Sequence, residues 1–223
     1  MNTVTLPAAP ITGSPVPHLT SIHSTVVRGP YGDARYPGNC SGQIIKDLLL
    51  FFKPHRVFDP MSGSGTCADV CKELGIFCKS GDIKTGFDAG NPKCYEGMEP
   101  FDFIWIHPPY WRMKIYNQDA RCLSNAPDLA TFYLMLRRVI QNCKSALSER
   151  GKLAILMGDY HDMKLGKIAP CTQITREIAL REGLWPACTE IIRFQHGNSS
   201  SKKEYASSFI PGLHDTCMIY QKA

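Results

Sequence analysis

The spacing of apolar and polar residues becomes regular near residue 41. Beyond it, segments of helical and strand spacing alternate, and residues such as Gly75 and Gly183 separate them. The pattern predicts helices at residues 43–52, 66–74, 128–147 and 172–182. It predicts strands at residues 56–59, 76–82, 101–106, 152–157, 187–195 and 214–221. Because such alternation is typical of βαβ units, we expect an α/β fold with a mostly parallel, twisted sheet flanked by helices.

The first 39 residues follow a different pattern. They hold six prolines, and proline cannot continue a helix or a central strand. We interpret residues 1–39 as an extended arm rich in proline and glycine that wraps the domain or reaches a partner. Residues 40–223 are then one folded domain.

Composition narrows the classes of protein. The 223 residues include 43% hydrophobic and 20% charged residues, which suits a single globular domain. The net charge of +5 and pI of about 8.6 permit a nucleic-acid partner, although a clear basic footprint lies above roughly 9. The apolar runs are far shorter than the roughly 18 residues of a membrane span, and residues 1–17 lack the features of a secretory signal. We therefore expect a cytoplasmic protein without membrane attachment.

The cysteines and histidines do not predict a metal site. None of the ten cysteines forms a Cys-x-x-Cys pair, and the nearest spacing is that of Cys67 and Cys71. His161 and His214 follow or begin predicted strands but lack a third ligand at suitable spacing. The thiols are interpreted as buried structural groups, and no metal is expected.

Polar residues and glycines follow the first predicted strand. The segment reads Asp59-Pro60-Met61-Ser62-Gly63-Ser64-Gly65-Thr66 and leads into a predicted helix. Glycines let a ligand approach the backbone, and a helix N-terminus offers free N–H groups. Asp82 ends the next strand, where a carboxylate can accept the two hydroxyls of a ribose. An ordinary strand-to-helix turn and a solvated turn aspartate are the alternatives that these residues leave open.

The third predicted strand ends in His107-Pro108-Pro109-Tyr110-Trp111. Paired prolines restrict the backbone and leave carbonyl groups without competing local N–H donors. An aromatic ring beside such carbonyls can stack on a flat heterocycle whose amine donates to a carbonyl and a polar side chain. A structural Pro-Pro turn with core aromatics is the alternative. All three sites lie where ligands bind in open α/β sheets, at the carboxyl ends of strands.

These motifs together resemble those of the S-adenosylmethionine-dependent DNA amino-methyltransferases, the N6-adenine and N4-cytosine family. Residues 59–66 are similar to that family's Asp-Pro-Phe-x-Gly-Ser-Gly-Thr loop, and residues 107–110 to its Asp/Asn/Ser-Pro-Pro-Tyr tetrapeptide. The segment from Tyr36 and Pro37 to Gly42 resembles the family's cofactor-methionine segment. The likeness runs from about residue 35 to the C-terminus and implies a class I methyltransferase-like Rossmann fold.

The resemblance also implies roles for individual residues. S-adenosylmethionine would be bound by Tyr36, Pro37, Asp59, Pro60, Met61, Ser62, Gly63, Gly65, Thr66 and Asp82. The catalytic residues would be His107, Pro108, Pro109 and Tyr110. The chain departs from the family at His107, where Asp, Asn or Ser is usual; a neutral imidazole can still accept an amine hydrogen, whereas a protonated one cannot. It also lacks a stretch long enough for a separate target-recognition domain.

The implied reaction transfers a methyl group to an exocyclic amine of a DNA base that is flipped or single-stranded. N6 of adenine is favoured over N4 of cytosine, with low sequence specificity. The alternatives are methylation of RNA or another planar amine, and a catalytically inactive cofactor-binding remnant with a regulatory role. DNA contacts are predicted at Trp111, Arg112, Lys114, Arg121, Arg193, Lys202 and Lys203, although solvated surface charge is the alternative for each cation. The sequence leaves open whether the chain forms a homodimer.

Overall fold

The computed structural model describes residues 5–8, 10–194 and 210–223. The helices are α1 (Gly42–Phe52), α2 (Thr66–Leu74), α3 (Leu129–Ala146) and α4 (Cys171–Arg181). The strands are β1 (Ile22–His23), β2 (Arg56–Asp59), β3 (Phe77–Ser80), β4 (Phe101–Ile106), β5 (Leu147–Met157), β6 (Tyr160–Asp162), β7 (Lys167–Ala169), β8 (Leu184–Pro186), β9 (Ile191–Phe194) and β10 (His214–Lys222). Short 3₁₀ turns lie at Ile83–Thr85, Pro92–Tyr95, Trp111–Met113 and Leu123–Asn125.

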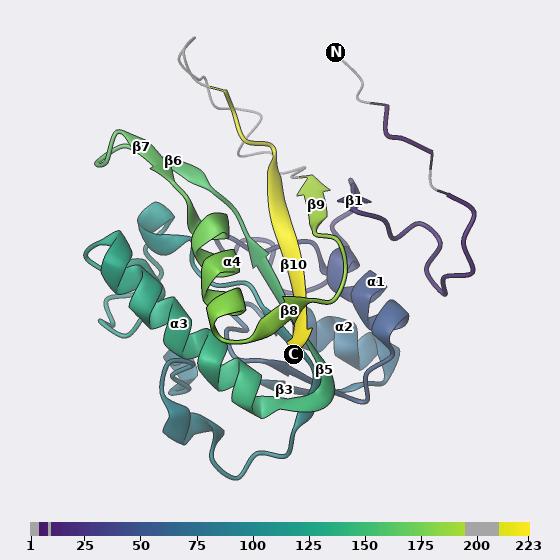
Figure 1. Cartoon of the computed structure of the whole chain (residues 1–223), viewed down its shortest axis with the longest axis horizontal. Helices are drawn as coiled ribbons and strands as arrows, with labels where there is room; N and C mark the ends of the chain where they lie inside the picture. Colours follow the sequence, from purple (N-terminus) through teal and green to yellow (C-terminus); the bar gives the residue numbers. More distant parts are fainter. Residues whose placement is uncertain (1–4, 9, 195–209) are drawn as a thin grey trace.

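The main sheet has the strand order β1-β9-β10-β5-β4-β2-β3, with β8 paired to β10 (Figure 1). Strands β3, β2, β4 and β5 are parallel neighbours. The strand β10 runs antiparallel to β5 and β9. Because the central strands are parallel, their carboxyl ends meet at one edge of the sheet. The predicted α/β fold is confirmed.

Helices cover both faces of this sheet (Figure 1). On one face, α3 and α4 pack on Ile104 and Ile106 of β4. On the other, α1 and α2 pack on Phe103 and Trp105 of the same strand. Alternate side chains of a strand point to opposite faces, so the near-continuous apolar run of β4 fills two cores.

The structure contains elements that the apolar pattern did not predict. Part of the predicted arm joins the sheet, because β1 pairs in parallel with β9. Strand β5 begins at Leu147, directly after α3, instead of at residue 152. The hairpin of β6 and β7 and the short β8 were also not predicted. Strands β1, β6, β7 and β8 have only two or three residues each, so local spacing carries little signal for them. Residue 195 of the predicted 187–195 strand lies outside the described residues.

No helix within the described ranges has the length and apolar character needed to cross a lipid bilayer.

Candidate functional site

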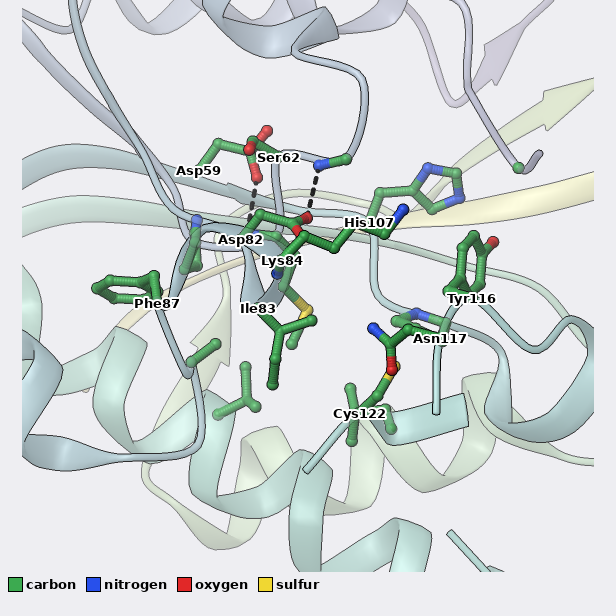
Figure 2. A pocket seen from close by; sticks show the side chains of 18 of the residues that line it. Asp59, Ser62, Asp82, Ile83, Lys84, Phe87, His107, Tyr116, Asn117 and Cys122 are labelled. Atoms are coloured by element: carbon green, nitrogen blue, oxygen red, sulfur yellow. Dashed lines mark hydrogen bonds between the residues drawn. The ribbon is translucent and has the colours of Figure 1, made fainter. Parts of the chain in front are cut away.

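The loop between β2 and α2 is shaped by two glycines and one carboxylate. Gly63 and Gly65 have φ of +50° and +86°, a region that non-glycine residues rarely adopt. Asp82, beyond β3, accepts a hydrogen bond of 3.0 Å from the Gly63 N–H and another of 2.9 Å from the Lys84 N–H (Figure 2). The same carboxylate therefore holds both the glycine loop and the following 3₁₀ turn. This places Asp82 beside the loop.

Asp59 closes the base of this loop from the end of β2. It is buried and accepts a hydrogen bond of 3.1 Å from the Met61 N–H (Figure 2). Burial raises the pKa of the Asp59 carboxyl well above its usual range. Its first role is therefore to fix the turn that places Met61 and Ser62.

A cavity of about 180 Å³ lies over the loop, at the carboxyl edge of the sheet. Of the residues predicted to bind a cofactor, those that line it are Tyr36, Asp59, Pro60, Met61, Ser62, Gly63, Thr66 and Asp82. Pro37 and Gly65 do not line it. The cavity also brings in His107 and Pro109 from the segment after β4. Sequence positions from 36 to 109 thus meet at one site.

Further lining residues come from elements that the sequence did not connect with the loop. Ile83, Lys84 and Phe87 follow Asp82 directly, so the turn-rich composition of that segment was the available signal (Figure 2). The residues from more distant segments include Asn39, Tyr116, Asn117, Cys122, Met135 and Arg138. No local motif distinguishes these residues, because tertiary packing brings them to the site.

The segment around Tyr36 folds over the cavity. The rings of Tyr36 and Tyr116 are stacked, with centroids 6.0 Å apart, and the Lys84 ammonium lies 4.7 Å from the Tyr36 centroid. The Thr66 hydroxyl donates a 2.5 Å hydrogen bond to the Asn39 side-chain oxygen. Gly38, with φ of +76°, has no room for a side chain because the Tyr116 hydroxyl occupies that space. The end of the predicted arm is therefore part of the cavity wall.

The segment after β4 forms a chain of polar contacts. The His107 Nε2 lies 2.9 Å from the Tyr110 hydroxyl, and the nearby Asp215 carboxylate contributes to a raised pKa of Tyr110. Asp215 forms an ion pair with Arg193. Burial lowers the pKa of His107 to about 4 and raises the pKa of Tyr110 well above its usual range. Both side chains are consequently uncharged near neutral pH.

The uncharged His107 ring carries a proton on one nitrogen and none on the other. It therefore offers one hydrogen-bond acceptor, and its Nε2 contacts the Tyr110 hydroxyl.

Trp111 and Arg112 are fixed within the protein. The Trp111 ring is buried, and its Nε1–H donates a 2.8 Å hydrogen bond to the Ala126 carbonyl. Arg112 lies over this ring at 4.0 Å and forms two hydrogen bonds of 2.8 Å to the buried Asp162. The indole that we predicted to contact DNA therefore packs in the core, and Arg112 joins the loop to the β6–β7 hairpin.

An open groove adjoins the cavity. Both are lined by Gly38, Asn39, His107 and Tyr116, and the groove continues along Pro108, Tyr110 and the β6–β7 hairpin. Among the predicted DNA-contacting cations, Arg112 and Arg193 line the groove but are ion-paired. Lys114 is exposed outside this lining.

The remaining predicted cations lie elsewhere. Arg121 lines the cavity and pairs with Asp119 at 2.7 Å. Lys202 and Lys203 lie outside the described residues. The predicted cations that the structure describes are therefore divided between the cavity, the groove and the surface.

The mostly parallel sheet carries a glycine loop and an acidic strand end at its carboxyl edge, the arrangement of open α/β folds that bind ligands there. TrmN from Thermus thermophilus aligns with 84% of this chain and 50% of its own, at 15% identity and a TM-score of 0.52. This likeness shows the fold alone.

Two further solved structures align with the chain at lower TM-scores. An S-adenosylmethionine-dependent methyltransferase from Archaeoglobus fulgidus aligns at 15% identity over 83% of this chain and 96% of its own, with a TM-score of 0.49. A Thermus thermophilus protein described as a DNA modification methylase, complexed with S-adenosyl-L-methionine, aligns at 18% identity over 75% of this chain and 55% of its own, with a TM-score of 0.44. The chain spans about half the length of TrmN and of this methylase. No protein-family model and no curated protein matches the sequence.

Proposed function

We propose that this chain is an S-adenosylmethionine-dependent methyltransferase that acts on an exocyclic amino group of a DNA base, N6 of adenine before N4 of cytosine. The observation that carries the proposal is the meeting of a cavity of about 180 Å³ and a much larger groove of about 1360 Å³ at His107. The smaller space suits a small cofactor, and the larger one has room for a polymer. At this boundary a methyl group would pass from a cofactor in the cavity to a base in the groove.

The residues of the cavity suit the cofactor. The Asp82 carboxylate accepts a single backbone hydrogen bond on each oxygen, so further lone pairs remain for ribose hydroxyls. Ile83 and Phe87 offer apolar contact for an adenine ring. The backbone of residues 62–66 suits the methionine moiety, because free N–H groups at the start of α2 favour a carboxylate. When bound, S-adenosylmethionine supplies an electrophilic methyl group on its sulfonium.

His107 and Pro108 would position the target amine. The lone pair of an exocyclic amine is delocalised into its ring, so the nitrogen is a poor nucleophile. Hydrogen bonds from that amine to His107 Nδ1 and to the Pro108 carbonyl would favour tetrahedral geometry at the nitrogen. Tyr110 contacts His107 Nε2 and lines the groove where the base would lie; in the proposed tautomer the proton is on Nε2 and Nδ1 accepts. Orientation of this kind is worth on the order of 7–11 kcal/mol.

Among the described residues that line the groove, Arg112 and Arg193 are engaged by Asp162 and Asp215, and the Arg28 guanidinium donates to backbone carbonyl groups. Lys164 of the β6–β7 turn lines it and is exposed, and Lys114 is exposed nearby in sequence. Phosphate contacts would come from these lysines. A small number of contacts predicts weak binding that salt readily disrupts.

The proposal is tested by incubating the protein with methyl-labelled S-adenosylmethionine and, separately, single-stranded DNA, duplex DNA and RNA. We expect label in DNA, more in single strands, and loss of at least about 100-fold in His107→Ala, a typical size for a positioned catalytic group. Glu96→Gln, an exposed change away from the site, should retain wild-type transfer. Label in RNA alone would overturn the DNA assignment. No transfer by protein that binds the cofactor would overturn the enzymatic one.

A further inference from the structure

Three cysteines meet behind the cofactor loop. Cys67 and Cys71 are four residues apart on α2, so they share one face of the helix, and Cys78 lies on the neighbouring strand β3. Their sulfur atoms all lie within 4.8 Å of one another. Cys67 and Cys71 are buried and Cys78 is partly exposed. Sequence spacing missed this group because the third cysteine comes from the next element.

The proposed methyl transfer does not use these thiols. None of the three lines the cavity or the groove. Cys67 and Cys71 belong to the apolar core between the sheet and helices α1 and α2, and Cys78 packs against it. In the described part of the chain, these are the thiols that bring three soft ligands to one point.

The spacing suits a three-coordinate centre. With metal–sulfur bonds of about 2.3 Å, as for zinc, the corners of a trigonal site are about 4.0 Å apart, so small side-chain shifts would close the group. Among the described residues, no carboxylate or imidazole joins the three thiols. Structural zinc sites need four ligands, and hard cations need oxygen ligands. The ions that fit this group of ligands are therefore soft ions that bind three sulfur atoms.

We propose that Cys67, Cys71 and Cys78 form a binding site for a soft, thiophilic ion in three-coordinate geometry. The two candidate ligands are Cu(I) and trivalent arsenic. Arsenous acid would form three As–S bonds and release three water molecules, which leaves no net charge in the apolar core. Cu(I) bound by the three thiolates would release three protons to the buffer and leave a net charge of −2 at the site. The site is distinct from the proposed cofactor cavity and does not depend on the proposed methyl transfer.

The test measures the uptake of arsenite, Cu(I) and Zn²⁺ by reduced full-length protein with native mass spectrometry. We expect one equivalent of at least one soft centre, bound more tightly than Zn²⁺. Cys78→Ala should weaken its binding about 10-fold or more, since even outer partners of metal ligands contribute about 10- to 100-fold. The exposed Cys188→Ala variant should bind as wild type does. The mass of the bound species shows whether the protein takes up Cu(I) or arsenic.

Alkylation mapping supplies a second measurement on the wild-type chain, in case Cys78→Ala does not fold. The bound centre should protect the partly exposed Cys78 and leave the exposed Cys188 reactive, whereas Cys67 and Cys71 are shielded by burial in either state. Absence of uptake, protection confined to other cysteines, equal binding by a folded Cys78→Ala variant, or preference for Zn²⁺ would each overturn the proposal.

Discussion

The ionisation of His107 gives a quantitative prediction. Burial lowers its pKa to about 4, whereas an imidazole in water has a pKa of about 6.5. A difference of about 2.5 units corresponds to roughly 3 kcal/mol of preference for the neutral ring. At pH 6 the ring would then be about 1% protonated, against about three-quarters for an unperturbed histidine. Because the proposed reaction needs the neutral ring, activity should persist well below pH 6.5.

The assay is kcat/KM for methyl transfer between pH 5 and 8, since this ratio reports groups that titrate in the free enzyme. We expect no decline attributable to His107 above about pH 5. His107→Asn, which cannot titrate, serves as the reference for other groups. A wild-type decline with a midpoint near 6.5 that is missing from His107→Asn would refute the reasoning.

The same shift predicts an effect on stability. The unfolded chain binds a proton on His107 below about pH 6.5, while the folded chain resists it down to about pH 4. The contribution of His107 to the free energy of unfolding should therefore be constant above that window and fall by up to about 3 kcal/mol as pH decreases through it. Urea unfolding of wild type and His107→Asn at several pH values measures this difference.

Three further substitutions test contacts around the site. Asp82→Asn removes the carboxylate charge beside Gly63, so cofactor affinity measured by calorimetry should fall about 10- to 100-fold, the equivalent of a charged hydrogen bond. Gly158→Ala would place a Cβ against Asp215 and 2.8 Å from Tyr110 Cε2, so scanning calorimetry should show a destabilisation of about 1–3 kcal/mol. Arg193→Met removes the guanidinium that neutralises the buried Asp215 carboxylate, and the free energy of unfolding in urea should fall by about 3–5 kcal/mol.

Matched substitutions separate these effects from general ones. Glu96→Gln should leave cofactor affinity unchanged, and Gly13→Ala, with nothing within 4 Å of the added Cβ, should leave the melting temperature unchanged. Arg35→Met breaks an exposed ion pair and should cost less than about 1 kcal/mol. If a site variant and its matched variant show the same change in affinity or stability, the role given to that contact is wrong.

Local sequence patterns predicted the frame of the molecule well. Helix α2 begins at Thr66 and ends before Gly75 as expected, because a glycine terminates it and its apolar residues repeat at helical spacing. Strand β4 was recognised from six residues with little polar interruption. The glycine loop and Asp82 were predicted at neighbouring strand ends because of the strand–loop–helix–strand order of the chain, and the Gly63–Asp82 hydrogen bond joins them.

Contacts between distant segments were not predicted. Tyr110 and Asp215 meet beside Gly158 although they lie more than 100 residues apart, and no local pattern links the two. Trp111 was expected at the DNA, but its burial depends on a hydrogen bond to Ala126 from another turn. Gly38 and Tyr116 meet over the cavity for the same kind of reason. Periodicity reports which face of an element is buried, whereas the identity of its tertiary neighbours depends on the packing of the whole domain.

The central claim is methyl transfer to an exocyclic amine of a DNA base, and nucleoside mass spectrometry tests it most directly. DNA treated with the protein and deuteromethyl S-adenosylmethionine would be digested and compared with DNA treated with His107→Ala. The account predicts deuteromethyl label on N6 of deoxyadenosine, or on N4 of deoxycytidine, in the wild-type sample. Absence of labelled deoxynucleosides, or label on a ring carbon, would contradict it.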